Sequence, residues 1–159
     1  MPITIRIARP EDSPQIFQFI CDLAEYEKAR EAVKCTVESL SESLFNRNAV
    51  AQTLIVEDDK QAIGYAIYFF NYSTWLAAKG LYLEDLYIDP DHRGKGAGIM
   101  LMKYLAKEAR TQDCQRFEWS VLDWNTPSRE FYESFGAKPM EEWVSYRLEG
   151  GALESFGSE

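Results

Sequence analysis

Hydrophobic residues recur along the chain with two different periods. Alternation with a period of two, or a short apolar run, predicts strands at residues 3–8, 50–57, 62–70, 81–88, 114–122 and 143–148. Apolar residues three and four apart predict helices at residues 12–30, 36–45, 99–109 and 128–135. This order of elements predicts one mixed α/β domain over residues 1–159, in which strand, helix and strand between 81 and 122 form a right-handed parallel unit.

Local signals mark several boundaries between these elements. Asp12 and Thr36 are typical N-cap residues for the first two helices. Gly64, inside a predicted strand, indicates a β-bulge. Residues 71–80 are expected to form an aromatic loop, and the tail from Gly150 is expected to be mobile or to dock on a partner subunit.

The composition supports a sizeable core and an acidic surface. Of the 159 residues, 46% are hydrophobic and 14% aromatic, and the formal net charge is −9. Because nucleic-acid binding needs a basic surface, this charge argues against nucleic acid as the main partner. A cationic substrate is compatible with the charge, although many soluble proteins are acidic without having one.

Neither a metal site nor a disulfide framework is expected. The three cysteines, Cys21, Cys35 and Cys114, lie far apart and are odd in number, so they are interpreted as reduced, packed thiols. The first residues do not form a signal peptide, and no apolar run approaches the roughly 18 residues of a membrane span. We therefore expect a cytoplasmic protein without a membrane partner.

Residues 81–105 join an apolar strand, a glycine loop and the start of a helix. The loop, residues 93–98, reads Arg-Gly-Lys-Gly-Ala-Gly. Glycines let a ligand approach the backbone, and the helix start presents free N–H groups at the positive end of its dipole. The segment therefore predicts an anion site, most often for phosphate. Glu84 and Asp85 interrupt the strand, which indicates acidic chemistry nearby, because isolated buried charge is costly.

The glycine spacing excludes two common phosphate loops. A P-loop requires Gly-Lys-Ser/Thr, whereas Gly98 is followed by Ile99. A dinucleotide fingerprint requires G-x-G-x-x-G near the first strand, whereas the spacing here is G-x-G-x-G after the fourth strand. A different kind of phosphate-bearing cofactor is therefore expected.

The motif Arg-Gly-x-Gly-x-Gly, followed at residues 124–132 by Trp-Asn-x-Pro-x-x-x-Phe-Tyr, resembles the GNAT N-acetyltransferases over nearly the whole chain. The resemblance implies the GNAT acyl-CoA N-acyltransferase fold, an α/β fold with a central, mostly antiparallel sheet, a splayed parallel strand pair and flanking helices. It also implies acetyl-CoA as co-substrate and no metal. The cofactor contacts that it implies are Leu86, Tyr87, Ile88, Arg93, Gly94, Lys95, Gly96, Ala97, Gly98, Ile99, Asn125, Ser128 and Tyr132.

Four shorter motifs indicate the acceptor. Residues 26–27, 73–75, 82–85 and 121–125 resemble the diamine and polyamine acetyltransferases of the spermidine/spermine type and their thialysine-acetylating relatives. This resemblance implies a small amine substrate and a homodimer. The substrate contacts that it implies are Tyr26, Glu27, Trp75, Glu84 and Asp85, with carboxylates meeting ammonium groups and aromatic rings making cation–π contacts.

Two residues are predicted to be catalytic. An amine attacks a thioester only as the free base, and a lysine-like ammonium has a pKa of about 10.4, so a base is needed. Glu84, on the strand beside the glycine loop, is the candidate, directly or through water. The family pattern places Tyr132 where it would protonate the leaving thiolate. In a regular strand Glu84 and Asp85 point to opposite faces, so both line the substrate path only if a bulge intervenes.

Three functions remain open from the sequence. They are acetyl transfer to a small polyamine or lysine-like molecule in a ternary complex, acetylation of a protein N-terminus or lysine, and acyl-CoA sensing without turnover. The presence of Glu84 and Tyr132 argues against the sensor. His92, the only histidine, is interpreted as a loop residue. The sequence does not rank spermidine, short diamines, thialysine and lysine as acceptors.

Overall fold

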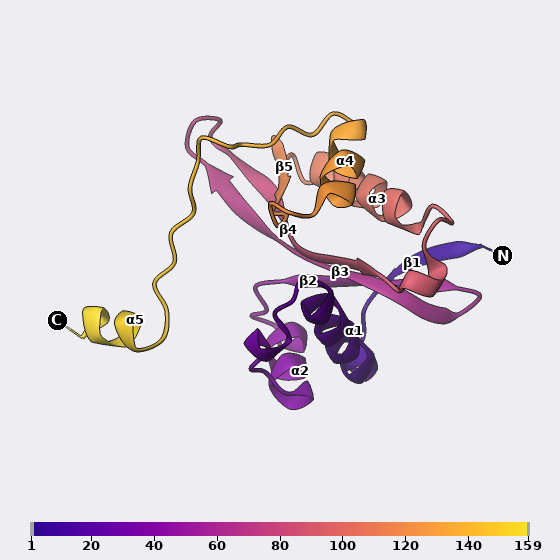
Figure 1. Cartoon of the computed structure of the whole chain (residues 1–159), viewed down its shortest axis with the longest axis horizontal. Coiled ribbons are helices and arrows are strands. Elements are labelled where there is room, and N and C mark those ends of the chain that lie inside the picture. Colours follow the sequence, from indigo (N-terminus) through magenta and orange to yellow (C-terminus); the bar gives the residue numbers. More distant parts are fainter. Residues whose placement is uncertain (1, 159) are drawn as a thin grey trace. The chain divides into compact units, whose positions relative to one another are not determined.

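The computed structural model describes residues 2–158, which form two compact units that divide between Ser120 and Val121. The first unit contains a five-stranded sheet and the helices α1 (Ser13–Tyr26), α2 (Val37–Phe45) and α3 (Ala97–Thr111) (Figure 1). It also has three short 3₁₀ turns, η1 (Pro10–Asp12), η2 (Arg30–Ala32) and η3 (Pro90–His92). None of the helices in the described part of the chain is long and apolar enough to cross a membrane.

The sheet has the strand order β1-β2-β3-β4-β5. Its strands are β1 (Ile3–Ile7), β2 (Gln52–Asp58), β3 (Gln61–Ser73), β4 (Ala78–Ile88) and β5 (Arg116–Trp119). Neighbouring strands from β1 to β4 are antiparallel, whereas β4 and β5 are parallel and are connected through α3, since a parallel pair needs a crossover. This mixed sheet with one parallel pair confirms the predicted fold class.

Helices cover both faces of the sheet (Figure 1). On the face of α1 and α2, the ring of Tyr65 in β3 stacks on Phe19 of α1 with centroids 5.9 Å apart. On the opposite face, Tyr68 of β3 points toward α3, where Glu108 and Tyr104 act electrostatically on its phenol. The odd-numbered residues of this part of β3 therefore face α1 and the even-numbered residues face α3.

Both predicted N-cap positions precede helices, but only one caps through its side chain. Thr36 accepts a hydrogen bond from the backbone N–H of Ser39 in α2, as predicted. Asp12 instead pairs with the guanidinium of Arg6 at 2.8 Å and makes no side-chain cap. α1 also ends at residue 26, earlier than predicted, and Lys28 then takes a left-handed φ of 63°.

Residues 71–80, predicted to be a loop, are mostly strand. β3 continues to Ser73 and β4 begins at Ala78, which leaves only residues 74–77 for the turn. The hydroxyl of Ser73 accepts the N–H of Leu76 at 3.2 Å. Of the two aromatic residues of this segment, Tyr72 extends the β3–β4 ladder opposite Lys79, whereas Trp75 lies in the turn.

The bulge predicted at Gly64 is confirmed. The register between β2 and β3 shifts directly after the pair of Val56 and Gly64, which makes Ile63 the extra residue. Packing also requires glycine here, because a Cβ at this position would collide with the carbonyl oxygen of Tyr87 in β4.

The second unit contains α4 (Thr126–Ser134) and α5 (Gly150–Gly157). The strand predicted at residues 143–148 is wrong, because these residues join no ladder in the described chain. A β-strand is stable only where a neighbour satisfies its backbone N–H and C=O groups, and hydrophobic pattern alone does not supply that neighbour. The tail from Gly150, predicted to be mobile or to dock on a partner subunit, forms α5.

Candidate active site

A second bulge places the two carboxylates of β4. Asp85 pairs with Ile67 of β3, whereas Leu83 pairs with Tyr68, so Glu84 is the extra residue between them. Ile67 belongs to the core cluster under α1, and Tyr68 faces α3. Leu83 and Asp85 therefore lie on opposite faces of the sheet, although residues two apart in a regular strand share a face. The bulge that the sequence analysis required for Glu84 and Asp85 is present.

The sheet opens at the same place. The parallel register of β4 with β5 runs from the pair of Gly80 and Arg116 to that of Leu83 and Trp119, where β5 ends. Beyond it, residues 85–88 of β4 pair with β3 alone among the described strands. This segment includes the three residues that were expected to contact a cofactor through their backbone, and it presents them on an edge that β5 does not cover.

An acidic pair lies on the α1 face. Asp85 accepts a hydrogen bond from the hydroxyl of Tyr65 at 2.8 Å. Burial raises the pKa of Asp85, and the Tyr65 bond opposes that rise. Glu27, directly after α1, also has a raised pKa, first through burial and then through the charge of Asp85. The structure thus brings together two predicted substrate residues, and α1 ends beside them with Tyr26 partly exposed.

Tyr65 is a member of this cluster that the sequence analysis missed. Its side chain is fully buried, and burial followed by the charge of Asp85 raises its pKa well above the usual range. No local signal identifies it, because a tyrosine in an apolar strand reads as an ordinary core aromatic residue. Its register position relative to the bulge in β4 is what places its hydroxyl on Asp85.

The glycine loop leads into α3 with open backbone groups. Gly94 and Gly96 have left-handed φ values of 81° and 86°, and a Cβ on either would meet no atom within 4 Å. Gly96 is the N-cap of α3 without a side-chain cap, and the first helical bond runs from the N–H of Met100 to its carbonyl. The N–H groups of Ala97, Gly98 and Ile99 therefore have no partner inside the helix, which is the arrangement that favours an anion.

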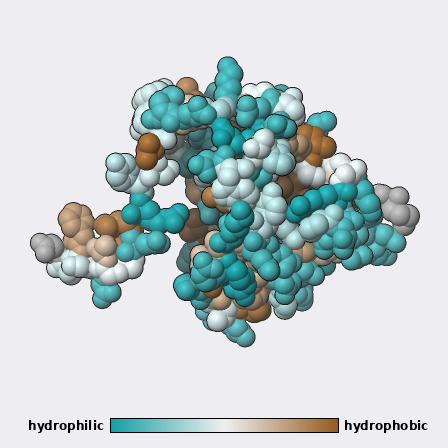
Figure 2. Space-filling view, viewed as in Figure 1, coloured by the Kyte–Doolittle hydropathy of each residue, from teal (hydrophilic) through white to brown (hydrophobic). Residues whose placement is uncertain are grey.

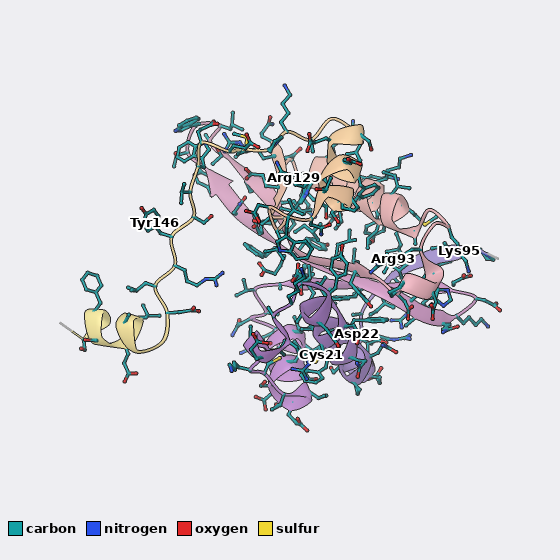
Figure 3. All side chains as sticks on the ribbon, viewed as in Figure 1. Cys21, Asp22, Arg93, Lys95, Arg129 and Tyr146 are labelled. Atoms are coloured by element: carbon teal, nitrogen blue, oxygen red, sulfur yellow. The ribbon has the colours of Figure 1, made fainter. Side chains whose placement is uncertain are left out.

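The two cations of the loop contact protein groups (Figure 3). Arg93 donates from Nε to the carbonyl of Ile88 at 2.8 Å, and its guanidinium carbon lies 5.6 Å from the ring centroids of both Tyr26 and Tyr87. Lys95 Nζ lies 3.4 Å from a carboxylate oxygen of Asp58. Arg93 thereby links the loop to the end of α1 and to β4.

Asp58 was not predicted to take part in the site. It ends β2 and, besides Lys95, has His92 Nδ1 at 3.8 Å. Two loop residues therefore meet one carboxylate of the hairpin turn. The sequence analysis assigned Asp58 only to a turn, since nothing in the local pattern indicates which loop lies against it.

Trp75 does not join the acidic pair within one chain. It lies in the turn between β3 and β4, where it is largely exposed. At about 3.3 Å per residue, the strand from Ile67, the partner of Asp85, to Ser73 spans roughly 20 Å. A contact of Trp75 with the same acceptor group would therefore need a long acceptor or a second subunit.

The remaining predicted contacts belong to the second unit. Asn125 is the N-cap of α4, and its side-chain oxygen accepts from the N–H of Ser128 at 3.4 Å. Tyr132 lies near the C-terminal end of α4, with its ring 5.6 Å from Phe131 and 6.4 Å from Phe135 between centroids. The helix predicted at residues 128–135 is therefore present, and it begins two residues earlier than predicted.

No group of three or more His, Cys, Asp or Glu side chains within residues 2–158 is arranged to hold a metal ion. The described residues of the site offer carboxylates, phenols and backbone amides. These groups can move protons, bind cations and stabilise anions.

Comparisons with known proteins agree with this arrangement. Residues 15–137, which include β2 to β5, the glycine loop and α4, match the acetyltransferase (GNAT) family. The thialysine N-epsilon-acetyltransferase of Sus scrofa is 36% identical, over 97% of this chain and 96% of the relative. The L-ornithine N5-acetyltransferase of Arabidopsis thaliana is 30% identical, over 96% of this chain and 86% of the relative.

A solved structure extends the agreement to the fold. An integron cassette protein from the mobile metagenome of V. cholerae is 26% identical and superposes with a TM-score of 0.85. The superposition covers 100% of this chain and 99% of the other. The order of strands and helices described above therefore recurs in an independently determined protein.

Proposed function

Because the chain belongs to the GNAT acetyltransferase family, we propose that it transfers the acetyl group of acetyl-CoA to a primary amine of a small cationic acceptor. The acceptor is a diamine, a polyamine or a thialysine- or lysine-like amino acid. The observation that carries this proposal is the bulge at Glu84, which places two carboxylates where β4 leaves its pairing with β5. Residues 1–159 act as one N-acetyltransferase domain of a cytoplasmic enzyme.

Acetyl-CoA binds along the open edge of β4 and at the glycine loop. The backbone of Leu86 to Ile88 bonds the pantetheine arm, and the residues from Arg93 to Ile99 hold the pyrophosphate. Backbone N–H groups at the start of α3 carry most of this binding, because the Arg93 and Lys95 side chains already contact protein groups. Asn125, Ser128 and Tyr132 supply the second cofactor segment.

The acidic pair selects a cationic acceptor. The charge of Asp85 raises the pKa of Glu27, and a cation bound between the two carboxylates relieves this repulsion. Tyr26 adds an aromatic face that favours a cation. The relatives' names support the assignment, because thialysine and ornithine both carry a primary amine on a flexible side chain.

Glu84 prepares the nucleophile. The ammonium loses a proton to Glu84, directly or through water, and the free amine attacks the carbonyl carbon of the thioester. A backbone N–H on the open edge of β4 stabilises the oxyanion of the tetrahedral intermediate. The carbon–sulfur bond then breaks, and the CoA thiolate takes its proton from Tyr132. The second proton that the nitrogen loses on becoming an amide returns through water to the Tyr132 phenolate.

Thiol release measured with acetyl-CoA and an amine panel tests the proposal. The panel contains thialysine, ornithine, spermidine, a short diamine and a peptide with a free N-terminus and one lysine. We expect turnover with one or more of the small cations and little with the peptide. Turnover confined to the peptide would support protein acetylation, and acetyl-CoA binding without release of thiol would support a sensor.

We also propose a homodimer. The second unit exposes large apolar side chains, with Trp143 at 64%, Tyr146 at 95% and Phe156 at 75% exposure, and hydrophobic atoms are visible on α5 in Figure 2. Contiguous exposed apolar residues are typical of interaction surfaces. Sedimentation equilibrium of the full chain is expected to give twice the monomer mass, and a Tyr146→Asp substitution should shift it toward the monomer. A monomer at all concentrations would contradict this proposal.

A further inference from the structure

We propose that Tyr65 is a positioning residue that fixes the Asp85 carboxylate for a second cationic group of the acceptor. This inference rests on the proposed function, because it concerns the same acceptor site. Tyr65 does not contact the reacting amine. It acts through Asp85, by holding one carboxylate oxygen and leaving the other oxygen for the ligand.

The packing contacts of Tyr65 are made by its ring and not by its hydroxyl. The ring of Tyr65 stacks on Phe19 with an interplanar angle of 3°, and it lies 6.5 Å from the ring of Tyr87. A phenylalanine would keep both contacts. A fully buried hydroxyl is unfavourable without a hydrogen-bond partner, and the partner of this one is Asp85 Oδ2 at 2.8 Å.

The bulge makes this contact possible. Tyr65 lies on the α1 face of β3, and Asp85 reaches that face only because Glu84 is inserted ahead of it in β4. Without the inserted residue, the side-chain alternation of β4 would direct residue 85 toward α3, where Leu83 lies. The bulge and the buried phenol therefore act together on one carboxylate.

The surrounding charges show why the carboxylate needs a donor. Glu27 after α1 and Tyr87 in β4 act on Tyr65, and Asp85 acts on Glu27. The charged groups that act on Tyr87 in turn are Asp22, Arg93, Asp89 and Asp91. Burial raises the pKa of Asp85, and the hydrogen bond from Tyr65 is the influence that lowers it. Removing the hydroxyl would raise the pKa of Asp85 further, so its negative charge would be lost at a higher pH.

The test compares two acceptors with the same five-carbon chain in the wild type and in Tyr65→Phe. Cadaverine carries a second ammonium, and pentylamine does not. We expect kcat/KM for cadaverine to fall about tenfold in Tyr65→Phe, mostly through KM, since a hydrogen bond to a charged group is worth about that factor. The acid limb of the pH profile of kcat/KM for cadaverine should move to higher pH. In the same variant, kcat/KM for pentylamine should change less than about twofold.

Tyr68→Phe is the matched control, because it removes a buried hydroxyl from the other face of the same strand. It should leave kcat/KM for both acceptors and the pH profile for cadaverine unchanged. Asp85→Asn distinguishes a failure of the Tyr65 inference from a failure of the proposed function. If Asp85→Asn loses selectivity for cadaverine while Tyr65→Phe keeps it with an unmoved acid limb, the inference is overturned and the proposed function stands. If wild-type enzyme acetylates no amine, both are overturned.

Discussion

The two halves of β4 differ in pairing, burial and charge. Residues 80–83 pair with β3 on one edge and β5 on the other, and Leu81 and Leu83 are almost completely buried. Among the described strands, residues 85–88 pair with β3 alone, and Glu84 is the extra residue directly before Asp85. The first half holds the sheet together, whereas the second half leaves backbone groups and carboxylates available to ligands.

The difference shows how one strand can serve both stability and chemistry. A single inserted residue reverses the side-chain alternation, so the aliphatic residues before it stay under α3 and the carboxylate after it moves to α1. Substitutions in the two halves should therefore have separable effects, on unfolding for the first half and on turnover for the second.

The largest effect is expected outside β4. Tyr132→Phe removes the proposed acid for the CoA thiolate and should lower kcat by about 10²–10⁴-fold, as is typical of general acid catalysis. Calorimetry should show CoA affinity close to that of the wild type, because the backbone carries most of the binding. Tyr146→Phe, a change on an exposed ring of the same unit, is the control. An unchanged kcat in Tyr132→Phe would remove the acid role.

In residues 80–83, the closed half of β4 that pairs on both edges, Leu83→Ala should reduce the free energy of unfolding by about 2–5 kcal/mol. This is the usual cost of truncating a buried leucine. Urea unfolding measures this change. Glu84→Gln, an isosteric change at an exposed residue, lies in residues 84–88, the open half of β4. Its free energy of unfolding should stay within about 0.5 kcal/mol of the wild type. Equal losses of unfolding free energy in both variants would show that the two halves do not differ in their contribution to stability.

Turnover should be affected mainly by the open half of β4, whereas stability depends mainly on the closed half. Glu84→Gln should lower kcat/KM about 10²-fold at neutral pH, because the variant cannot take the proton of the ammonium. The rate should recover as pH rises toward the amine pKa of about 10.4, since more acceptor is then already a free base. Glu38→Gln on α2 is an exposed control. A profile that keeps its wild-type shape would argue against a base at Glu84.

The glycine loop gives the smallest but most selective prediction. Gly96→Val places a branched side chain at a φ of 86° and in space that is open for a ligand. CoA affinity should fall at least about tenfold by calorimetry, which corresponds to about 1.4 kcal/mol. Gly157→Val in α5, where a Cβ also meets no neighbour, should bind CoA normally. Wild-type affinity in the loop variant would refute the phosphate-loop assignment.

Local patterns predicted the parts of the site that depend on local geometry. The spacing of Gly94 and Gly96 indicated the loop, and the apolar spacing at residues 128–135 indicated α4. The bulge at Glu84 was recognised only as a requirement, because an apolar strand with one inserted residue reads like a regular one. Its presence follows from the pairing of β4 with β3, which is a long-range property.

Long-range contacts also explain what the sequence analysis missed. Tyr65 and Asp58 gain their partners from segments that lie far away in the chain. The partner of Tyr65 is Asp85, and the partners of Asp58 are His92 in η3 and Lys95 in the glycine loop. The error at residues 143–148 has the same origin. Its alternation is correct for a strand, but in the described chain no neighbouring strand pairs with it.

The central claim is that the open half of β4 selects a cationic acceptor, and wild-type enzyme tests it most directly. The measurement is the ratio of kcat/KM for cadaverine to that for pentylamine, with acetyl-CoA saturating at neutral pH. The account predicts a ratio of about ten or more, because the second ammonium gains a charge-assisted hydrogen bond to Asp85. A ratio near one would contradict it.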